Sequence, residues 1–473
     1  MEIIHITAEC YPVAKAGGLG DVAGALPKYQ TDLGHIAKVI MPMYRTKFLY
    51  ANEWDLVHEG GQYLGGTWFH YSVIKEKTNK LGFDLYLIDI NGLLDREKIY
   101  GYDDDTERFV AFQIAACDWL SRWEHKPSII HCHDHQAGLV PFMMKYCYDF
   151  HSLANVPSVF TIHNAEYQGW IWPNKHHLIP PHDTWKWGML EWHNNVNALA
   201  SAVKCAWKVT TVSPSYMEEL KQHAQGMEAL FHYETGKCSG ILNGIDTEVW
   251  NPATDPMIKK NFTVKTVKEG KEANKRALCE QFGLNPELPL FVFIGRLVGE
   301  KAADVLPDTF RHCLHHYSGK LSFLVLGSGD KVVEGKLEEV KHQFPGQLNT
   351  FIGYNETLSH MIYAGADFLL MPSRVEPCGL NQMYALRYGT VPMVRSVGGL
   401  KDTVKDFGDW HGFGIRFTHA NVHDVSDSVY RALDLYTNKR DLFNWMRNYM
   451  MALDNSWKHS ADEYIHLYQS IIH

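Results

Sequence analysis

Charged residues that could bind an anionic ligand follow several apolar runs of the sequence. In "FIGRLVGEK", residues 293–301, Arg296 comes directly after an apolar run and Lys301 follows five residues later. Two such cations can converge on a diphosphate. Exposed Arg and Lys are more often solvated surface charge, and this motif alone leaves that alternative open.

The segment "PSRVEPCGLNQMYALRYG", residues 372–389, combines an acid with the start of a helix. Glu376 precedes a proline, and Gly379 through Asn381 open a helical pattern that ends at Gly389. The N–H groups of a helix start attract a phosphate, and a carboxylate beside them can bind sugar hydroxyls. A buried acid is costly in a purely structural loop, so we interpret Glu376 as functional.

A glycine turn near the start of the chain is a further candidate for a ligand-binding segment. In "KAGGLGDVAG", residues 15–24, Lys15 leads into Gly17, Gly18 and Gly20. The spacing fits neither the dinucleotide fingerprint nor the Walker A motif, which places its lysine after the glycines. The turn either lets a ligand approach the backbone or lets a helix pack closely on a strand.

Two further strand ends carry polar groups. Asp134 lies in "HCHDHQ", and His163 and Asn164 lie in "TIHNAEYQG". All three can bond sugar hydroxyls, although His163 could also be a satisfied core histidine. The histidines alternating over 131–135 resemble a metal site, but no zinc-type cysteine pair or second carboxylate cluster accompanies them. We therefore favour Asp134 as a sugar ligand over a metal site.

Two series of short apolar runs, each run followed by a longer helical pattern, must position these residues. Such alternation predicts parallel sheets covered by helices, and the restart of the series predicts two doubly wound domains. Ligands bind at the carboxyl ends of such strands, so two facing edges would form a cleft between the domains. The predicted strands are 3–7, 37–42, 83–89, 128–134, 158–163 and 208–213, then 290–297, 321–329, 350–354, 367–373, 391–399 and 414–417.

Composition narrows the function classes. The 473 residues are 45% hydrophobic and 21% charged, which is typical of a globular protein. A formal charge of −9 without a long basic run argues against a nucleic-acid binder. Nine cysteines without CxxC pairs favour a reducing compartment, and neither a signal-peptide pattern nor a membrane-length apolar run is present. We expect a cytoplasmic protein with no membrane or nucleic-acid partner.

The polar stretch 251–289 separates the two series, which predicts a hinge near "LNGID", residues 242–246. The tail has no strand-like run and many aromatic residues at helical spacing, so we expect terminal helices that pack back on the first domain. The predicted domains are 1–245, 246–440 and the C-terminal helices 441–473.

Taken together, seven segments resemble the bacterial glycogen synthases and plant starch synthases, which are retaining glucosyltransferases of the GT-B architecture. The resemblance covers essentially the whole chain and implies an α/β fold of two Rossmann-like domains facing across a deep cleft. The absence of a transit segment favours the bacterial branch. The segments are "KAGGLGDV", "HCHDHQAGL", "TIHNAEYQG", "VSPSY", "LNGID", "GRLVGEK" and "EPCGLNQMYALRYGTVPMVRSVGGLKDTV".

The resemblance also implies roles for individual residues. Catalytic roles fall to Glu376, His163, Lys15, Asp134, Arg296 and Lys301. The implied donor site consists of Lys15, Gly17, Gly18, Asn243, Arg296, Lys301, Tyr354, Glu376, Cys378, Gly379, Leu380 and Asn381, with Tyr354 against the adenine. The implied acceptor and sugar ligands are Asp134, His163 and Asn164. No metal or other cofactor is expected, because Arg and Lys can stabilise the charge of the leaving diphosphate.

The implied reaction moves glucose from ADP-glucose to the non-reducing 4-hydroxyl of an α-1,4-glucan with retention of configuration. The sequence departs from the family pattern at four positions, Glu166, His135, Ala302 and Asn381. A sugar-nucleotide 2-epimerase of the same architecture remains an alternative. A non-catalytic glycan-binding protein is a second one, but it should have lost some of Lys15, Arg296, Lys301 and Glu376, and all four are present.

Overall fold

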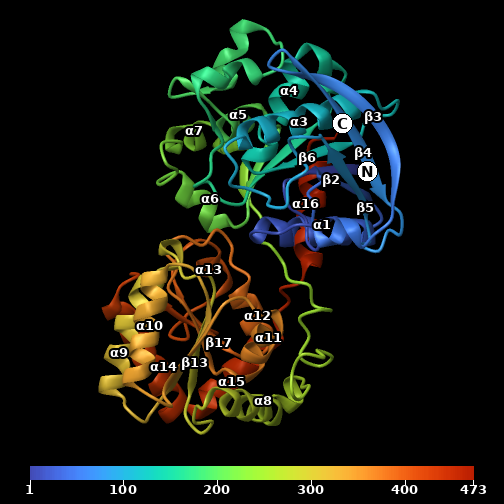
Figure 1. Cartoon of the computed structure of the whole chain (residues 1–473). Helices are drawn as coiled ribbons and strands as arrows, with labels where there is room; N and C mark the ends of the chain where they lie inside the picture. The colour runs from blue at the N-terminus through green and yellow to red at the C-terminus, as the bar shows by residue number, and fades with distance from the viewer. Residues whose placement is uncertain (473) are drawn as a thin grey trace. The chain divides into compact units, whose positions relative to one another are not determined.

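The computed structural model describes residues 1–472, which form two compact units. Unit 1 consists of Met1–Asn243 with the C-terminal segment from Trp457, and unit 2 consists of Gly244–Ser456. Each unit is built on its own sheet (Figure 1). The division after Asn243 falls within 242–246, where the sequence predicts the hinge.

Unit 1 contains a nine-stranded sheet in the order β12-β11-β7-β6-β1-β2-β5-β4-β3. The strands from β12 to β5 are parallel, whereas β4 is antiparallel to both β5 and β3. A small antiparallel sheet has the order β8-β10-β9. The strands are β1 (Glu2–Ile6), β2 (Ile36–Pro42), β3 (Trp54–Leu64), β4 (Thr67–Glu76), β5 (Asp84–Asp89), β6 (Ile129–His133), β7 (Ser158–Ile162), β8 (Trp170–Ile171), β9 (Glu191–Trp192), β10 (Asn195–Asn197), β11 (Lys208–Thr211) and β12 (Cys238–Gly240).

The helices of unit 1 cover this sheet. In α1, Leu19, Val22, Ala23 and Leu26 are buried at the three- and four-residue spacing of one helix face. Helices α1 and α16 lie side by side, although they come from opposite ends of the sequence (Figure 1). The helices are α1 (Gly18–Asp32), α2 (Lys47–Tyr50), α3 (Asp105–Ser121), α4 (Val140–Tyr146), α5 (Ala198–Cys205), α6 (Pro214–Leu220), α7 (Glu228–Tyr233) and α16 (Trp457–Gln469).

Unit 2 has a six-stranded, all-parallel sheet in the order β15-β14-β13-β16-β17-β18. Numbered within the unit, this is the 3-2-1-4-5-6 order of a doubly wound fold. The apolar runs become strands because helices bury both faces of the sheet. The strands are β13 (Leu290–Ile294), β14 (Ser322–Gly327), β15 (Leu348–Ile352), β16 (Phe368–Met371), β17 (Val391–Arg395) and β18 (Ile415–Phe417).

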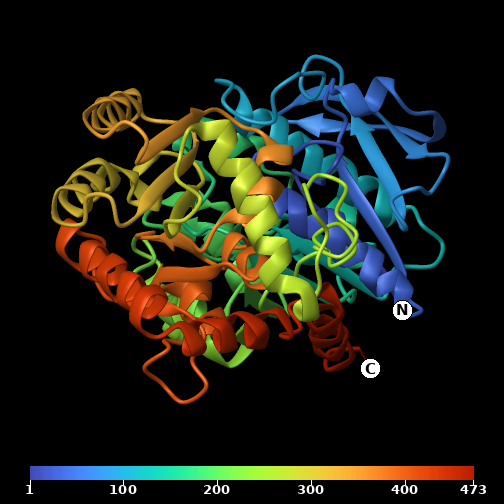
Figure 2. The ribbon, with the colours of Figure 1, turned by 90° about the horizontal axis from the view of Figure 1, so that it is seen from below.

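The helices of unit 2 complete its layers. Asp330 caps α10, since its Oδ1 accepts a 2.8 Å hydrogen bond from the backbone N–H of Val332. Helices α14 and α15 follow one another in orange-red and red along one side of the unit (Figure 2). The helices are α8 (Val267–Phe282), α9 (Leu306–His316), α10 (Lys331–Gln343), α11 (Glu356–Gly365), α12 (Asn381–Arg387), α13 (Gly398–Thr403), α14 (Val422–Asn438) and α15 (Arg440–Met451).

The tail divides differently from the sequence prediction of one C-terminal group over 441–473. Helix α15 buries Phe443, Met446 and Met450 in the core of unit 2. Only α16 packs in unit 1, where Trp457 and Tyr464 join Ile3 and Leu26 in one core cluster. The last residue, His473, lies outside the described residues.

Both units have a topological switch point, the place where the strand order reverses and ligands bind in doubly wound sheets. In unit 2 it lies between β13 and β16, and in unit 1 between β1 and β6. The loops that leave these four strands carry Lys15, Asp134, Arg296, Lys301 and Glu376. The topology therefore gathers the predicted charged residues at the switch point of each unit.

Candidate active site

The loops after β13 and β16 meet in an ion pair at the switch point of unit 2. Lys301 Nζ lies 2.5 Å from Glu376 Oε2, and Ser373 Oγ donates a 2.9 Å hydrogen bond to the same oxygen. The Glu376 side chain is 8% exposed and that of Lys301 is 24% exposed. A cation and an acid from two separate sequence motifs are thus held together at the sheet edge.

Two glycines hold the Glu376 loop in place. Gly398 has a φ of 46°, and a Cβ there would lie 2.0 Å from the carbonyl oxygen of Glu376. The N–H of Gly399 donates a 3.1 Å hydrogen bond to that oxygen, and a Cβ at Gly399 would lie 2.2 Å from the carbonyl oxygen of Cys378. Only glycine lets α13 approach this loop so closely. The contact fixes the backbone that carries the carboxylate.

Three other residues of unit 2 that are predicted to bind the nucleotide sugar make no hydrogen bond to this pair in the described residues. Arg296 is 60% exposed and pairs with Glu300, with Nη2 3.3 Å from Oε2, rather than converging on Lys301. Tyr354 follows β15 and is 84% exposed. Asn381 Nδ2 donates a 2.8 Å hydrogen bond to the carbonyl oxygen of Ile294, which ties the start of α12 to the end of β13.

The segment between Glu376 and α12 supplies the remaining residues of the prediction. Cys378 is buried, Gly379 has a φ of 77°, and Leu380 directly precedes α12. A Cβ at Gly379 would lie 2.5 Å from the end of the Gln382 side chain, but the left-handed backbone conformation is the stronger reason for glycine there.

In unit 1, a buried acid that the sequence analysis missed organises the glycine turn. Glu9 Oε2 accepts hydrogen bonds from the N–H groups of Ala16 (2.6 Å) and Gly17 (2.9 Å). Glu9 Oε1 accepts a 2.7 Å hydrogen bond from Tyr100 Oη. The position of Glu9 three residues past the end of β1 is the signal that could have identified it. The carboxylate sets the path of the backbone into α1.

The glycines of this turn have different functions. A Cβ at Gly24 would lie 2.4 Å from the carbonyl oxygen of Tyr11, so Gly24 allows close packing. Apart from the adjoining residues and the backbone of α1 itself, no atom of the described residues lies within 4 Å of a Cβ placed at Gly17 or Gly18, so packing does not require glycine at these two positions. This openness favours the approach of a ligand to the turn. Lys15 Nζ lies 2.7 Å from Asp21 Oδ1 beside it.

Asp134 and His163 lie together at the ends of β6 and β7. Asp134 Oδ1 accepts a 2.7 Å hydrogen bond from the N–H of His163. Burial raises the pKa of Asp134 to about 7, although the backbone N–H groups of His163 and Asn164 oppose the rise. Burial also lowers the pKa of His163 to about 3, so its ring is neutral at pH 7. Asn164 Oδ1 accepts a 3.0 Å hydrogen bond from the N–H of Glu166, one of the residues that departs from the family pattern.

Asn243, at the end of unit 1, has an unused polar atom. Its side chain is buried, and its Oδ1 has no hydrogen-bond partner among residues 1–472. A buried amide oxygen without a partner is costly, which favours a ligand as its partner. His135 Nδ1 and Gln136 Oε1, next to Asp134, are likewise buried without a partner in this part of the chain.

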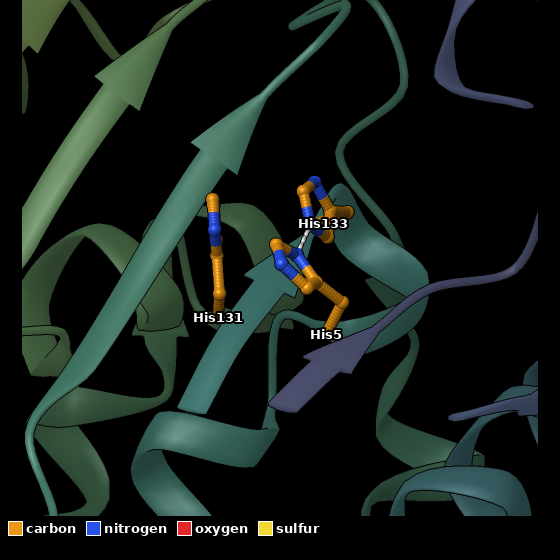
Figure 3. A group of neighbouring side chains, drawn as sticks. All are labelled: His5, His131 and His133. Carbon is orange, nitrogen blue, oxygen red and sulfur yellow. Dashed lines mark hydrogen bonds between the residues drawn. The ribbon is translucent and has the colours of Figure 1, made fainter. Parts of the chain in front are cut away.

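The structure contains a buried cluster of three histidines, but it differs from the alternating set His131, His133 and His135 noted in the sequence, because His5 takes the place of His135. His131 and His133 on β6 lie beside His5 of the neighbouring strand β1 (Figure 3). His135 lies beyond the end of β6. Every ring nitrogen of the three already has a protein partner: Gln30, Thr161, Tyr468, His163 or another ring of the cluster. A metal ion would have to displace these hydrogen bonds, so the donor set fits a polar network better than a metal site.

Ala302, another departure from the family pattern, has a φ of 52° and a ψ of 34°. This left-handed conformation disfavours every residue except glycine, at about 1–2 kcal/mol. The family pattern that the sequence resembles has glycine here, directly after Lys301, and this conformation explains that preference.

Comparison with known proteins settles the family. The model of the starch synthase catalytic domain matches residues 2–233, and that of the group 1 glycosyl transferases matches residues 274–444. The glycogen synthase of Flavobacterium johnsoniae is 51% identical over 472 residues, covering 100% of this chain and 99% of that protein. The chain belongs to the glycogen synthase family. The glycogen synthase of Geobacillus stearothermophilus is 37% identical over 502 residues, covering 100% of this chain and 98% of that protein.

Solved structures agree with the glycogen synthase assignment. The catalytic domain of starch synthase IV from Arabidopsis thaliana, bound to ADP and acarbose, matches with a TM-score of 0.89 and 32% identity, covering 100% of this chain and 99% of that one. Sucrose-phosphate synthase from Thermosynechococcus elongatus matches with a TM-score of 0.64 at 13% identity, covering 99% and 98%, which shows the fold alone. The predicted GT-B fold and the glycosyltransferase class are confirmed. The comparisons give no support to the epimerase alternative. Within residues 1–472, no helix is both long and apolar enough to span a membrane.

Proposed function

We propose that this glycogen synthase family member transfers glucose from ADP-glucose to the non-reducing 4-hydroxyl of an α-1,4-glucan, with retention of configuration. The observation that carries the proposal is the 2.5 Å pair of Lys301 and Glu376 at the switch point of a doubly wound sheet. The presence of ADP and acarbose in the related starch synthase structure supports a nucleotide and a glucan-like ligand.

The residues of unit 2 suit the nucleotide and its leaving group. Lys301 and Arg296 neutralise the diphosphate as the bond to glucose breaks, a role that Mg²⁺ fills in other transferases. Glu376 orients the ammonium of Lys301 and accepts hydrogen bonds from hydroxyls of the transferred glucose. Tyr354, exposed after β15, offers its ring to the adenine. The backbone at Cys378, Gly379, Leu380 and Asn381 completes the donor contacts.

The residues of unit 1 suit phosphate and sugar. Lys15 and the turn at Gly17 and Gly18 contact the donor phosphates, and the open space beside both glycines supports this role. Asp134, His163 and Asn164 bind sugar hydroxyls. Asn243 Oδ1, which has no partner among the described residues, accepts from a further sugar hydroxyl.

The chemistry follows from these groups. The predicted motifs contain no obvious covalent nucleophile, so the acceptor attacks from the face that the diphosphate leaves. The bond from the anomeric carbon to the phosphate oxygen breaks, the bond to the acceptor oxygen forms, and that phosphate oxygen takes the acceptor's proton. The residues supply charge stabilisation and orientation, and no bound metal is required. We place this reaction in the cytoplasm.

The test is incorporation of labelled glucose into glycogen, with ADP-glucose and UDP-glucose assayed in parallel and EDTA present. The proposal predicts incorporation from ADP-glucose that EDTA does not reduce. No incorporation from either donor by folded protein would refute the transferase. Donor turnover without glucan would instead indicate the epimerase, and loss of activity in EDTA would refute the metal-independent mechanism.

A further inference from the structure

A hydrogen-bonded chain begins at His163 and runs through the interior of unit 1. His163 Nε2 lies 3.0 Å from His133 Nδ1, and His133 Nε2 lies 3.0 Å from His5 Nδ1. His5 Nε2 in turn lies 2.7 Å from Gln30 Oε1 on α1. All four side chains are buried. Hydrogen bonds therefore connect His163, a candidate sugar-binding residue, to helix α1.

Beyond Gln30 the chain continues to the C-terminal helix. Gln30 Nε2 donates a 3.1 Å hydrogen bond to Tyr468 Oη, which lies 2.7 Å from His131 Nδ1. His131 Nε2 lies 2.6 Å from Thr161 Oγ1, which is 2.6 Å from Thr210 Oγ1. Seven hydrogen bonds thus join His163 to Thr210 without a break.

The carboxamide of Gln30 sets the direction of the chain. Its Oε1 can only accept, so His5 Nε2 carries the proton and His5 Nδ1 is the acceptor. His133 then donates from Nε2 to His5 and accepts at Nδ1, which requires His163 to donate from Nε2. This reasoning needs neutral rings, and burial supplies them by lowering the pKa of His5 to about 4 and that of His163 to about 3.

We propose that Gln30, His5 and His133 are positioning residues that hold the His163 ring in the tautomer protonated on Nε2. Nδ1 of His163 then carries a lone pair and accepts from a ligand hydroxyl, to which it cannot donate. From His163 through His133, His5 and Gln30 to Tyr468 each group donates to the next, so these hydrogen bonds polarise one another in one direction. The identity of the ligand, a glucosyl hydroxyl, rests on the proposed function.

The tautomer can be measured directly by NMR of protein labelled with ¹⁵N in the histidine rings only. A His163→Gln variant identifies the signals of His163. The proposal predicts one neutral form, with the proton on Nε2 and Nδ1 unprotonated. A proton on Nδ1, or a mixture of both forms in the wild type, would overturn it. This measurement needs no substitution in the chain beyond the one used for assignment.

A Gln30→Met substitution removes the acceptor at similar volume. The His163 signals should then show both tautomers, and kcat should fall by on the order of 10²-fold with KM changed much less. The matched control is Gln113→Met, another fully buried glutamine of unit 1 that bonds Phe109 and Leu139 and no histidine. The control should leave the His163 spectrum and kcat unchanged.

The outcomes separate this inference from the proposed function. An unchanged His163 spectrum in folded Gln30→Met protein would refute the role of Gln30. An equal fall of kcat in both glutamine variants would show a general packing effect and would also refute it. A wild-type protein without transferase activity would refute the proposed function, and the tautomer measurement would still decide the arrangement of the chain.

Discussion

Lys301 Nζ and Glu376 Oε2 lie 2.5 Å apart, although 75 residues separate them in the sequence. The two loops that carry them leave β13 and β16, the adjacent strands at which the order of the unit 2 sheet reverses. Glu376 thereby holds an ammonium at the edge where doubly wound folds bind ligands. Removing either group should lower the catalytic rate strongly and change the stability of the fold only slightly.

Glu376→Gln should lower kcat by on the order of 10²-fold or more, because Lys301 loses the carboxylate that orients it and the sugar loses an acceptor. The thermal midpoint should change by only a few degrees, since Lys301 remains partly exposed to water. Initial rates and thermal unfolding of the same preparations measure both effects.

The control for this substitution is Glu287→Gln, which removes the acid of an exposed ion pair with Arg276 (3.0 Å) in the same unit. It should leave both kcat and the midpoint nearly unchanged. Wild-type turnover by Glu376→Gln would remove Glu376 from the site.

Lys15→Ala should raise KM for the nucleotide sugar and lower kcat, together about 10²-fold in kcat/KM, because the donor phosphates lose a cation. The ion pair of Lys15 with Asp21 is partly exposed to water, so the free energy of unfolding should change by less than about 1 kcal/mol. Lys47→Ala, at the exposed start of α2, is the comparison and should retain full activity. Equal kinetics for the two variants would contradict the assignment.

Asn243→Ala should lower kcat/KM about tenfold and leave stability unchanged or slightly raised, since the buried Oδ1 has no hydrogen bond to lose within residues 1–472. Asn197→Ala is the opposite case, because its Oδ1 caps α5 through the N–H of Ala200 at 2.9 Å. That variant should lose about 1 kcal/mol of stability. If Asn243→Ala destabilised the protein as much as Asn197→Ala, its role would be structural.

Asp134→Asn should alter the pH dependence of stability. The folded pKa of Asp134, about 7, lies above its ordinary value of 3.8, so the folded state holds a proton that the unfolded state has released. The contribution of Asp134 to the free energy of unfolding is therefore greatest below pH 3.8. It declines as the pH rises to about 7, by up to about 4 kcal/mol. Asparagine does not ionise, so the variant should gain stability over the wild type above pH 7.

Urea unfolding of both proteins between pH 5 and pH 9 measures this difference. The buried neutral histidines, which lose stability as the pH falls below 6.5, are present in both proteins and cancel in the comparison. A constant difference across the range would show that Asp134 does not titrate as described. Transferase activity should be lost in the variant at every pH.

Much of the positioning framework follows from local sequence. All twelve predicted strands are present, because an apolar β-branched run between two covering helix layers has few other stable conformations. The order of those strands then places the residues after β1, β6, β13 and β16 at the switch points. The sequence alone could therefore indicate the charged residues of the candidate site, which are Lys15, Asp134, Arg296, Lys301 and Glu376.

The remaining features depend on contacts that local patterns do not contain. Strands β3 and β4 form a hairpin in which no residue of β3 is buried, and their polar and glycine residues make the apolar alternation weak. Glu9 holds the glycine turn through the backbone N–H groups of Ala16 and Gly17, and Gln30 bonds Tyr468, which is 438 residues away in the sequence. The spacing of aromatic residues in the tail predicts helices, but it does not indicate which unit each helix packs against. The prediction that α15 packs on the first domain was therefore wrong, since α15 lies in the core of unit 2.

The most direct test of retaining transfer is NMR of maltoheptaose elongated by the protein from ADP-glucose labelled with ¹³C at the anomeric carbon. The account predicts a single new α-glycosidic bond from the labelled carbon to the 4-hydroxyl of the non-reducing terminal residue. A β-linkage, a linkage at another hydroxyl, or labelled free glucose as the main product would contradict it.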